Sequence, residues 1–193
     1  ACEAQAPDVL DAPLRFAIGS NGLPDWTAAG AAAARLDLVD EVLRGLADDQ
    51  LGLSAGGGFD LVLDTSAFFD AVGASRSKLG LGSSAALTVA LASALVVQGG
   101  HSDAAQDRAV WLNRLLGLHR KFQGGQGSGV DVATSLYGGV LSYRLPGGDA
   151  LPEAVPLAWP AGLHTAFIWS GCSASTPKFL SILRDWRRRN TAN

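Results

Sequence analysis

The sequence has few charged residues and no methionine. Only 17% of its 193 positions are charged, and 15 Lys and Arg against 18 Asp and Glu leave a formal net charge of −3. The chain therefore lacks a basic field that would hold a nucleic-acid backbone, and we expect no nucleic-acid partner. Apolar residues make up 48% of the chain, which excludes a disordered protein and predicts a buried core.

Cysteines and long apolar runs are also scarce. Cys2 and Cys172 fit no metal-ligand or redox spacing, which favours a reducing compartment. No apolar run reaches the roughly 18 residues of a membrane span. The opening stretch "ACEAQAPDV" lacks the basic and apolar blocks of a signal peptide. We therefore expect a cytoplasmic protein without a membrane partner.

Helical and strand patterns alternate along the chain, but without the regular rhythm of a doubly wound sheet, which predicts an α+β fold. The helix predicted over 101–122 has Ser102 or Asp103 as its expected N-cap. Two predicted helices cover 29–47 and 101–122, and three more begin near Ser83, Val130 and Thr176. The predicted strands cover 14–19, 59–65, 138–144 and 164–170.

Small residues crowd the start of a buried helix in "KLGLGSSAALTVALASAL", which begins at Lys78. The first N–H groups of a helix have no intrahelical partner, and the helix dipole makes that end positive. Gly80 and Gly82 allow an anion close to the backbone, Ser83 and Ser84 add hydroxyls for phosphate or Mg²⁺, and Lys78 adds positive charge. The segment predicts a polyphosphate cradle, although it does not match the P-loop, whose lysine follows the glycines. A plain glycine–serine helix cap is the alternative.

A second glycine-rich stretch, "GQGSGVD", ends at Asp131, again where a helix begins. Close backbone approach followed by a fixed carboxylate suits a phosphoryl-transfer site near its acceptor. The alternative is that Asp131 is a first-turn acid that the helix dipole stabilises.

These two stretches resemble motifs of the GHMP kinase superfamily, which includes the galactokinase, homoserine, mevalonate and phosphomevalonate kinases. "KLGLGSSAALTVA" resembles the second motif of that superfamily. "QGGQGSGVDVATSLYGGVLSYR" (Gln123 to Arg144) is most similar to phosphomevalonate kinases, because it has their Gln-Gly lead-in, Gly-Ser-Gly-x-Asp-Val-Ala core and Tyr-Gly. A weaker match is "WSGCSAST" (Trp169 to Thr176), a turn that in these kinases faces the phosphate acceptor. The resemblance extends from about Phe59 to Thr176.

The resemblance implies a fold and a domain division. It implies a GHMP-kinase N-terminal domain (ribosomal protein S5 domain 2-like) over 1–157 and the start of a ferredoxin-like C-terminal domain over 158–193. The Pro-Gly-Lys strand and loop that open these kinases, and the glycine-rich motif that closes them, have no counterpart here. We therefore expect an internal fragment in which both domains are incomplete.

The implied activity is an ATP-dependent small-molecule kinase that transfers the γ-phosphoryl group to phosphomevalonate, in the isoprenoid precursor pathway. A mevalonate kinase, or another member with a hydroxyl acceptor, is one alternative. A non-catalytic sensor that keeps the fold is another. The implied cofactors are ATP and Mg²⁺, and the implied partners are a phosphorylated or hydroxylated isoprenoid precursor and, as an open option, a second copy of the chain.

The resemblance also implies roles for individual residues. Asp131 is the implied catalytic residue, as a general base or as an orienting group. A phosphomonoester, with a second pKa of about 6, is already a nucleophile, so Asp131 would then mainly orient it or position a cation. Ser84 is the implied metal ligand. The implied nucleotide-binding residues are Lys78, Gly80, Leu81, Gly82, Ser83, Ser84 and Ala85, and the implied substrate-binding residues are Gly127, Ser128, Gly129, Ser173, Ser175 and Thr176.

Three residues depart from the family pattern or invite a second interpretation. Mevalonate kinases place a metal-binding glutamate eleven residues before the aspartate, where this chain has Arg120, either a phosphate contact or a solvated helix end. His119 lies on the apolar stripe of its helix, which predicts a packed, hydrogen-bonded core histidine. Cys172 stands where a basic residue is expected, as a thiol in the acceptor pocket or as a buried filler.

Overall fold

The computed structural model describes residues 1–54, 57–70, 77–125, 127–147, 150–169, 171 and 176–190. The chain divides into two compact units, the first of Ala1–Thr65 and Gly82–Leu163 and the second of Ser66–Leu81 and His164–Asn193. The division expected at 157 stays a prediction. Within the described residues, no helix has both the length and the apolar character needed to cross a membrane.

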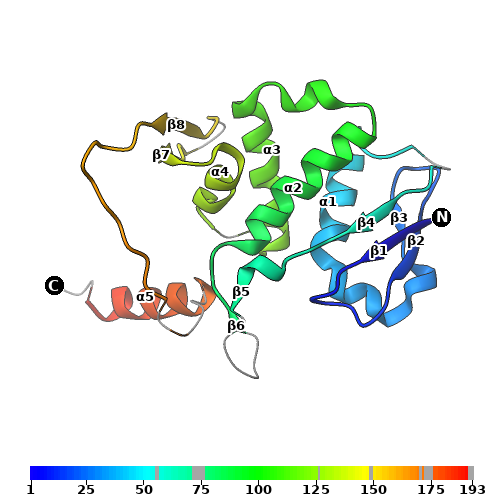
Figure 1. The fold of residues 1–193 in the computed structure, drawn as a ribbon, viewed down its shortest axis with the longest axis horizontal. Coiled ribbons are helices and arrows are strands. Elements are labelled where there is room, and N and C mark those ends of the chain that lie inside the picture. The colour runs from blue at the N-terminus through cyan, green and yellow to red at the C-terminus, as the bar shows by residue number, and fades with distance from the viewer. Residues whose placement is uncertain are drawn as a thin grey trace. The chain divides into compact units, whose positions relative to one another are not determined.

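A mixed four-stranded sheet begins the first unit (Figure 1). Its order is β3-β2-β1-β4, in which β1 pairs antiparallel with β2 and parallel with β4. The strands predicted over 14–19 and 59–65 are confirmed with shorter bounds, whereas β1 and β3 were not predicted. The four strands are β1 (Cys2–Gln5), β2 (Leu14–Ile18), β3 (Pro24–Asp25) and β4 (Asp60–Val62).

Four α-helices complete most of the first unit, and α2 packs against each of the other three. Their facing sides bury large side chains, among them Leu46, Trp111, Leu112 and Leu115. Full burial of each such leucine stabilises the fold by about 1.5–3 kcal/mol. The helices are α1 (Asp37–Asp48), α2 (Ser83–Gln98), α3 (Arg108–Phe122) and α4 (Val130–Tyr137).

Two helix predictions need correction. The predicted helix over 29–47 is a 3₁₀ segment (Thr27–Leu36) followed by α1. Gly30 kinks the 3₁₀ segment with non-helical angles of φ 58° and ψ −142°, and Leu36, with φ −110° and ψ 27°, separates the segment from α1. The predicted caps Ser102 and Asp103 are wrong, since these residues lie in a separate 3₁₀ turn, Ser102–Ala105. Asp107 caps α3, and its carboxylate accepts hydrogen bonds from the N–H groups of Ala109 and Val110.

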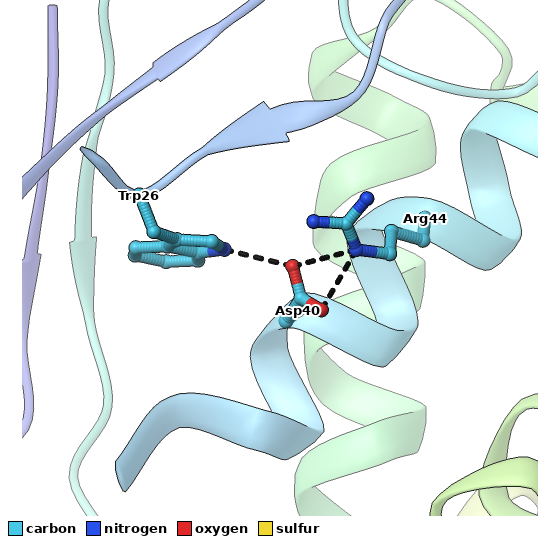
Figure 2. A network of polar contacts seen from close by, with 3 residues as sticks. All are labelled: Trp26, Asp40 and Arg44. Atoms are coloured by element: carbon cyan, nitrogen blue, oxygen red, sulfur yellow. Dashed lines mark hydrogen bonds and ion pairs between the residues drawn. The ribbon is translucent and has the colours of Figure 1, made fainter. Parts of the chain in front are cut away.

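A polar network fixes α1 to the turn that follows the sheet (Figure 2). The indole N–H of Trp26 donates to Asp40 Oδ1 at 2.8 Å, and Arg44 Nε donates to both oxygens of the same carboxylate at 2.9 and 2.8 Å. The Trp26 ring stacks on Phe16 of β2, with ring centroids 4.4 Å apart. One carboxylate on α1 thus joins the helix to the aromatic side chains that cover the sheet.

After α4 the chain forms an antiparallel pair, β7 (Val140–Arg144) and β8 (Glu153–Leu157), which confirms the strand predicted over 138–144. The second unit contains the short pair β5 (Phe69–Asp70) and β6 (Ser77–Lys78), and α5 (Thr176–Asn190) in the place predicted for a helix. The strand predicted over 164–170 is wrong for its described part, because residues 164–169 have no ladder partner among the described strands. A ferredoxin-like second domain stays a prediction.

Candidate functional site

The N-terminus of α2 begins at a glycine in the left-handed conformation. Gly82 has φ 75° and ψ 34° and is the N-cap of the helix. Glycine adopts these angles without the penalty that a Cβ atom imposes. Because Gly82 has no side chain, it offers no acceptor to the first N–H groups of α2, which makes this end suitable for an anion.

The N-terminus of α4 has the same construction. Gly129 is its N-cap, with φ 76° and ψ 11°. A Cβ atom at Gly129 would lie 1.9 Å from Leu116 Cδ2, so packing against α3 also requires glycine there. The hydroxyl of Tyr143 on β7 donates to the carbonyl of Ser128 at 2.8 Å. The glycine-rich turn before α4 is therefore held by packing against Leu116 of α3 and by a hydrogen bond from Tyr143 of β7.

These two helix ends meet. A Cβ atom on Gly82 would lie 3.6 Å from the Cβ of Asp131, and α2 packs against α4. Asp131 lies in the first turn of α4, is half-buried, and accepts a hydrogen bond from the Val132 N–H at 3.0 Å. The positive ends of two helix dipoles thus lie beside one carboxylate. The helix ends favour bound anionic groups, and the carboxylate favours a cation among them.

Ser84, in the first turn of α2, is joined to a buried histidine of α3. The distance from Ser84 Oγ to His119 Nε2 is 3.2 Å, and only 2% of His119 is exposed. The predicted packed and hydrogen-bonded core histidine is confirmed. Burial lowers the pKa of His119 below its ordinary value of 6.5, and the negative charge of Asp131 acts in the opposite direction.

The charges of Arg120 and Asp131 both shift the pKa of the Tyr143 phenol. Burial raises the pKa of Tyr143, the positive charge of Arg120 lowers it, and the negative charge of Asp131 raises it. Arg120 is half-buried on α3, next to His119. The guanidinium of Arg120 therefore lies near enough to Tyr143, whose hydroxyl holds the glycine-rich turn before α4, to act on it electrostatically.

The other predicted nucleotide-binding residues divide between the two units. Ser83 and Ala85 are buried in the first turn of α2, in the first unit, and their binding of a nucleotide stays a prediction. Lys78, Gly80 and Leu81 belong to the second unit, where Lys78 lies on β6 and pairs with Phe69. Their participation in one site with Gly82 stays a prediction.

The predicted substrate-binding residues divide in a similar way. Gly127 and Ser128 are exposed just before α4, and Gly127 has φ +110°. Ser173 and Ser175 lie outside the described residues, as does Cys172. Thr176 is the first residue of α5.

The residues at the starts of α2 and α4 carry oxygen ligands, which suit a magnesium ion better than a transition metal. Among the residues that the structure describes, no three His, Cys, Asp or Glu side chains form a metal-binding group. Mg²⁺ is usually held by one or two carboxylates together with substrate phosphates and water. The Ser84 hydroxyl at the start of α2 and the Asp131 carboxylate at the start of α4 are oxygen ligands of this kind, and their binding of a nucleotide-bound Mg²⁺ stays a prediction.

Two contacts of the site were not predicted. Tyr143 lies in a stretch that resembles the family, but no spacing in the sequence links its hydroxyl to the carbonyl of Ser128. His119 was expected to have a hydrogen-bond partner, but its apolar stripe could not identify Ser84. Both contacts join elements that are distant in sequence.

Comparison with known proteins assigns the family. The family model described as "GHMP kinases N terminal domain" matches residues 37–139, which is more than half of the chain and extends from α1 through α4. The chain belongs to this family, whose members are ATP-dependent kinases of small molecules. No curated protein and no solved structure matches the chain.

Proposed function

We propose that this protein transfers the γ-phosphoryl group of ATP to phosphomevalonate. The observation that carries the proposal is the approach of Gly82 to Asp131, where a Cβ atom on the glycine would lie 3.6 Å from the aspartate Cβ. A triphosphate seated on the N-terminus of α2 would therefore have a carboxylate beside its phosphates. That is the arrangement that transfer to an acceptor requires.

The nucleotide side of the reaction uses the backbone of α2. Its first N–H groups and dipole hold the phosphates, and the left-handed Gly82 lets them approach closely. Ser84 and Asp131 would hold the Mg²⁺, which neutralises charge on the transferring group when it is bound. Catalysis in this scheme consists mainly of positioning and electrostatic stabilisation.

The acceptor side favours a phosphorylated molecule. Phosphoryl transfer between two anions needs positive charge, and Arg120 lies close enough to Tyr143 to lower the pKa of its phenol. The stretch from Gln123 to Arg144 resembles phosphomevalonate kinases more than other members of the family. Because the acceptor phosphate is mostly dianionic at neutral pH, Asp131 orients it and need not remove a proton.

A coupled assay of ADP release tests the proposal. The full gene product is given Mg·ATP with mevalonate or phosphomevalonate in separate reactions, and we expect turnover only with phosphomevalonate. Turnover with mevalonate alone would establish the hydroxyl-acceptor alternative. Thermal stabilisation by Mg·ATP, with turnover of neither acceptor, would favour a non-catalytic sensor. A homodimer and a cytoplasmic location stay predictions.

A further inference from the structure

Ser84 is held by side chains at both its hydroxyl and its carbonyl. Serine hydroxyls in helices often bond back to a carbonyl of their own helix. Ser84 Oγ lies 3.2 Å from Nε2 of His119 on α3. The Thr88 hydroxyl, which is fully buried, donates to the Ser84 carbonyl at 2.9 Å. The Ser84 hydroxyl is therefore held by a tertiary contact with α3, whereas its carbonyl is held within α2 itself.

The direction of the Ser84–His119 hydrogen bond decides what Ser84 can bind. A serine hydroxyl has one proton and two lone pairs. If Nε2 accepts that proton, the Ser84 oxygen has only lone pairs left, which suit a cation. If Nε2 carries its own proton and donates it, the Ser84 proton stays available for a phosphate oxygen. Neutral imidazole exists in both tautomers, so the environment selects one of them.

We propose that His119 is a positioning residue whose Nε2 accepts the Ser84 hydroxyl proton and so directs the lone pairs of Ser84 to the divalent cation of a bound nucleotide. This inference rests on the proposed function. Its physical basis is that His119 is 2% exposed and lies within hydrogen-bond distance of a hydroxyl in the first turn of α2, the helix whose N-cap Gly82 lies beside Asp131. His119 acts through Ser84 and does not itself touch the reacting atoms.

A matched pair of variants separates the hydrogen bond from the packing. The amide of glutamine in His119→Gln extends to the position of Nε2, whereas that of asparagine in His119→Asn reaches only the position of Nδ1. Isothermal titration with a non-hydrolysable ATP analogue measures its dissociation constant with Mg²⁺ and with EDTA. We expect His119→Asn to weaken Mg²⁺-dependent binding about three- to tenfold, the value of one hydrogen bond, and to leave binding in EDTA unchanged. We expect His119→Gln to stay within about twofold of the wild type.

A second background tests whether His119 acts through Ser84. In Ser84→Ala, which keeps the buried histidine, His119→Asn should cause no further loss of Mg²⁺-dependent affinity, because the hydroxyl is already absent. Additive losses in the double variant would overturn the inference. Equal weakening with Mg²⁺ and with EDTA would overturn it too, since His119 would then only support the helix end.

The tautomer can be observed in the wild-type protein without any substitution. The ¹⁵N chemical shift of His119 Nε2 reports whether this nitrogen carries a proton, and we expect the unprotonated form. A protonated Nε2 would overturn the inference even if the variants failed to fold, and would leave the proposed kinase function standing. Failure of the wild-type protein to bind the analogue at all would overturn both.

Discussion

Gly82 and Asp131 lie so close that a Cβ atom on the glycine would contact the Cβ of the aspartate, at 3.6 Å. The two residues come from the starts of different helices, α2 and α4, and each helix begins at a left-handed glycine. This contact places an acidic side chain beside a helix end that favours anions. The following predictions examine the contacts that create this arrangement and the chemistry that it supports.

Removal of the Asp131 charge should impair turnover more than folding. In Asp131→Asn the side-chain oxygen can still accept the Val132 N–H, so the fold should be retained. We expect kcat to fall by about 100-fold, comparable to the loss of one stabilising group in a preorganised site. Steady-state kinetics and urea unfolding of the same preparation measure the two effects. A large loss of stability with proportionate loss of activity would return Asp131 to a structural role.

Arg120 should contribute to acceptor binding. We expect Arg120→Gln to raise the KM for phosphomevalonate by about tenfold or more, the value of a charge-assisted hydrogen bond, with the KM for ATP unchanged. Lys121→Gln is the matched control, because Lys121 is the adjacent residue and its ammonium faces Asp48 at 3.8 Å. If both variants behave alike, Arg120 is no more than part of the solvated end of α3.

Gly129 should tolerate no side chain. In Gly129→Ala the new Cβ would overlap Leu116 Cδ2 at 1.9 Å and would also require a left-handed alanine. Overpacking and backbone strain together should destabilise the protein by about 2–4 kcal/mol. Gly117→Ala is the control, since no atom lies within 4 Å of its Cβ position in α3, and helix propensity should stabilise it by up to about 1 kcal/mol. Urea unfolding compares the two.

Asp40 should stabilise the fold without affecting the site. Asp40→Ala removes the acceptor of both the Trp26 indole and the Arg44 guanidinium (Figure 2). We expect a loss of about 1–3 kcal/mol in the free energy of unfolding, with nucleotide affinity unchanged. Thermal denaturation measures stability, and isothermal titration measures nucleotide affinity. Altered nucleotide affinity would contradict the expectation that this network does not influence the α2–α4 contact.

Stability without metal should decrease in mild acid because of His119. Burial lowers the pKa of His119 in the folded protein, so the unfolded chain binds more protons below pH 6.5. The contribution of His119 is therefore fully present above the unfolded pKa and is lost as the pH falls from 6.5 toward the folded pKa. Urea unfolding in EDTA at pH 7.5 and 5.5 should show this decrease, and His119→Gln should reduce it. An equal decrease in both proteins would assign the effect to other groups.

Several parts of the fold follow from local sequence. Gly82 and Gly129 precede apolar helical stretches, and a glycine at such a boundary favours the left-handed angles that start each helix. The apolar stripe of α3 indicated that His119 is buried. Local pattern failed where packing or capping made the choice, as for Asp107 at the start of α3 and for residues 164–169, which pair with none of the described strands.

The local sequence favours two helices that begin at a glycine, because glycine adopts left-handed angles at such a boundary without the penalty of a Cβ atom. The meeting of those helix ends is not a property of the local sequence, because the contact of Gly82 with Asp131 and that of Ser84 with His119 depend on how α2 packs against α3 and α4. Helix packing depends on the shape of the whole buried surface, which no short motif contains. The motifs therefore indicate a phosphate-binding chemistry, and the packing of the helices supplies the acid and the histidine beside it.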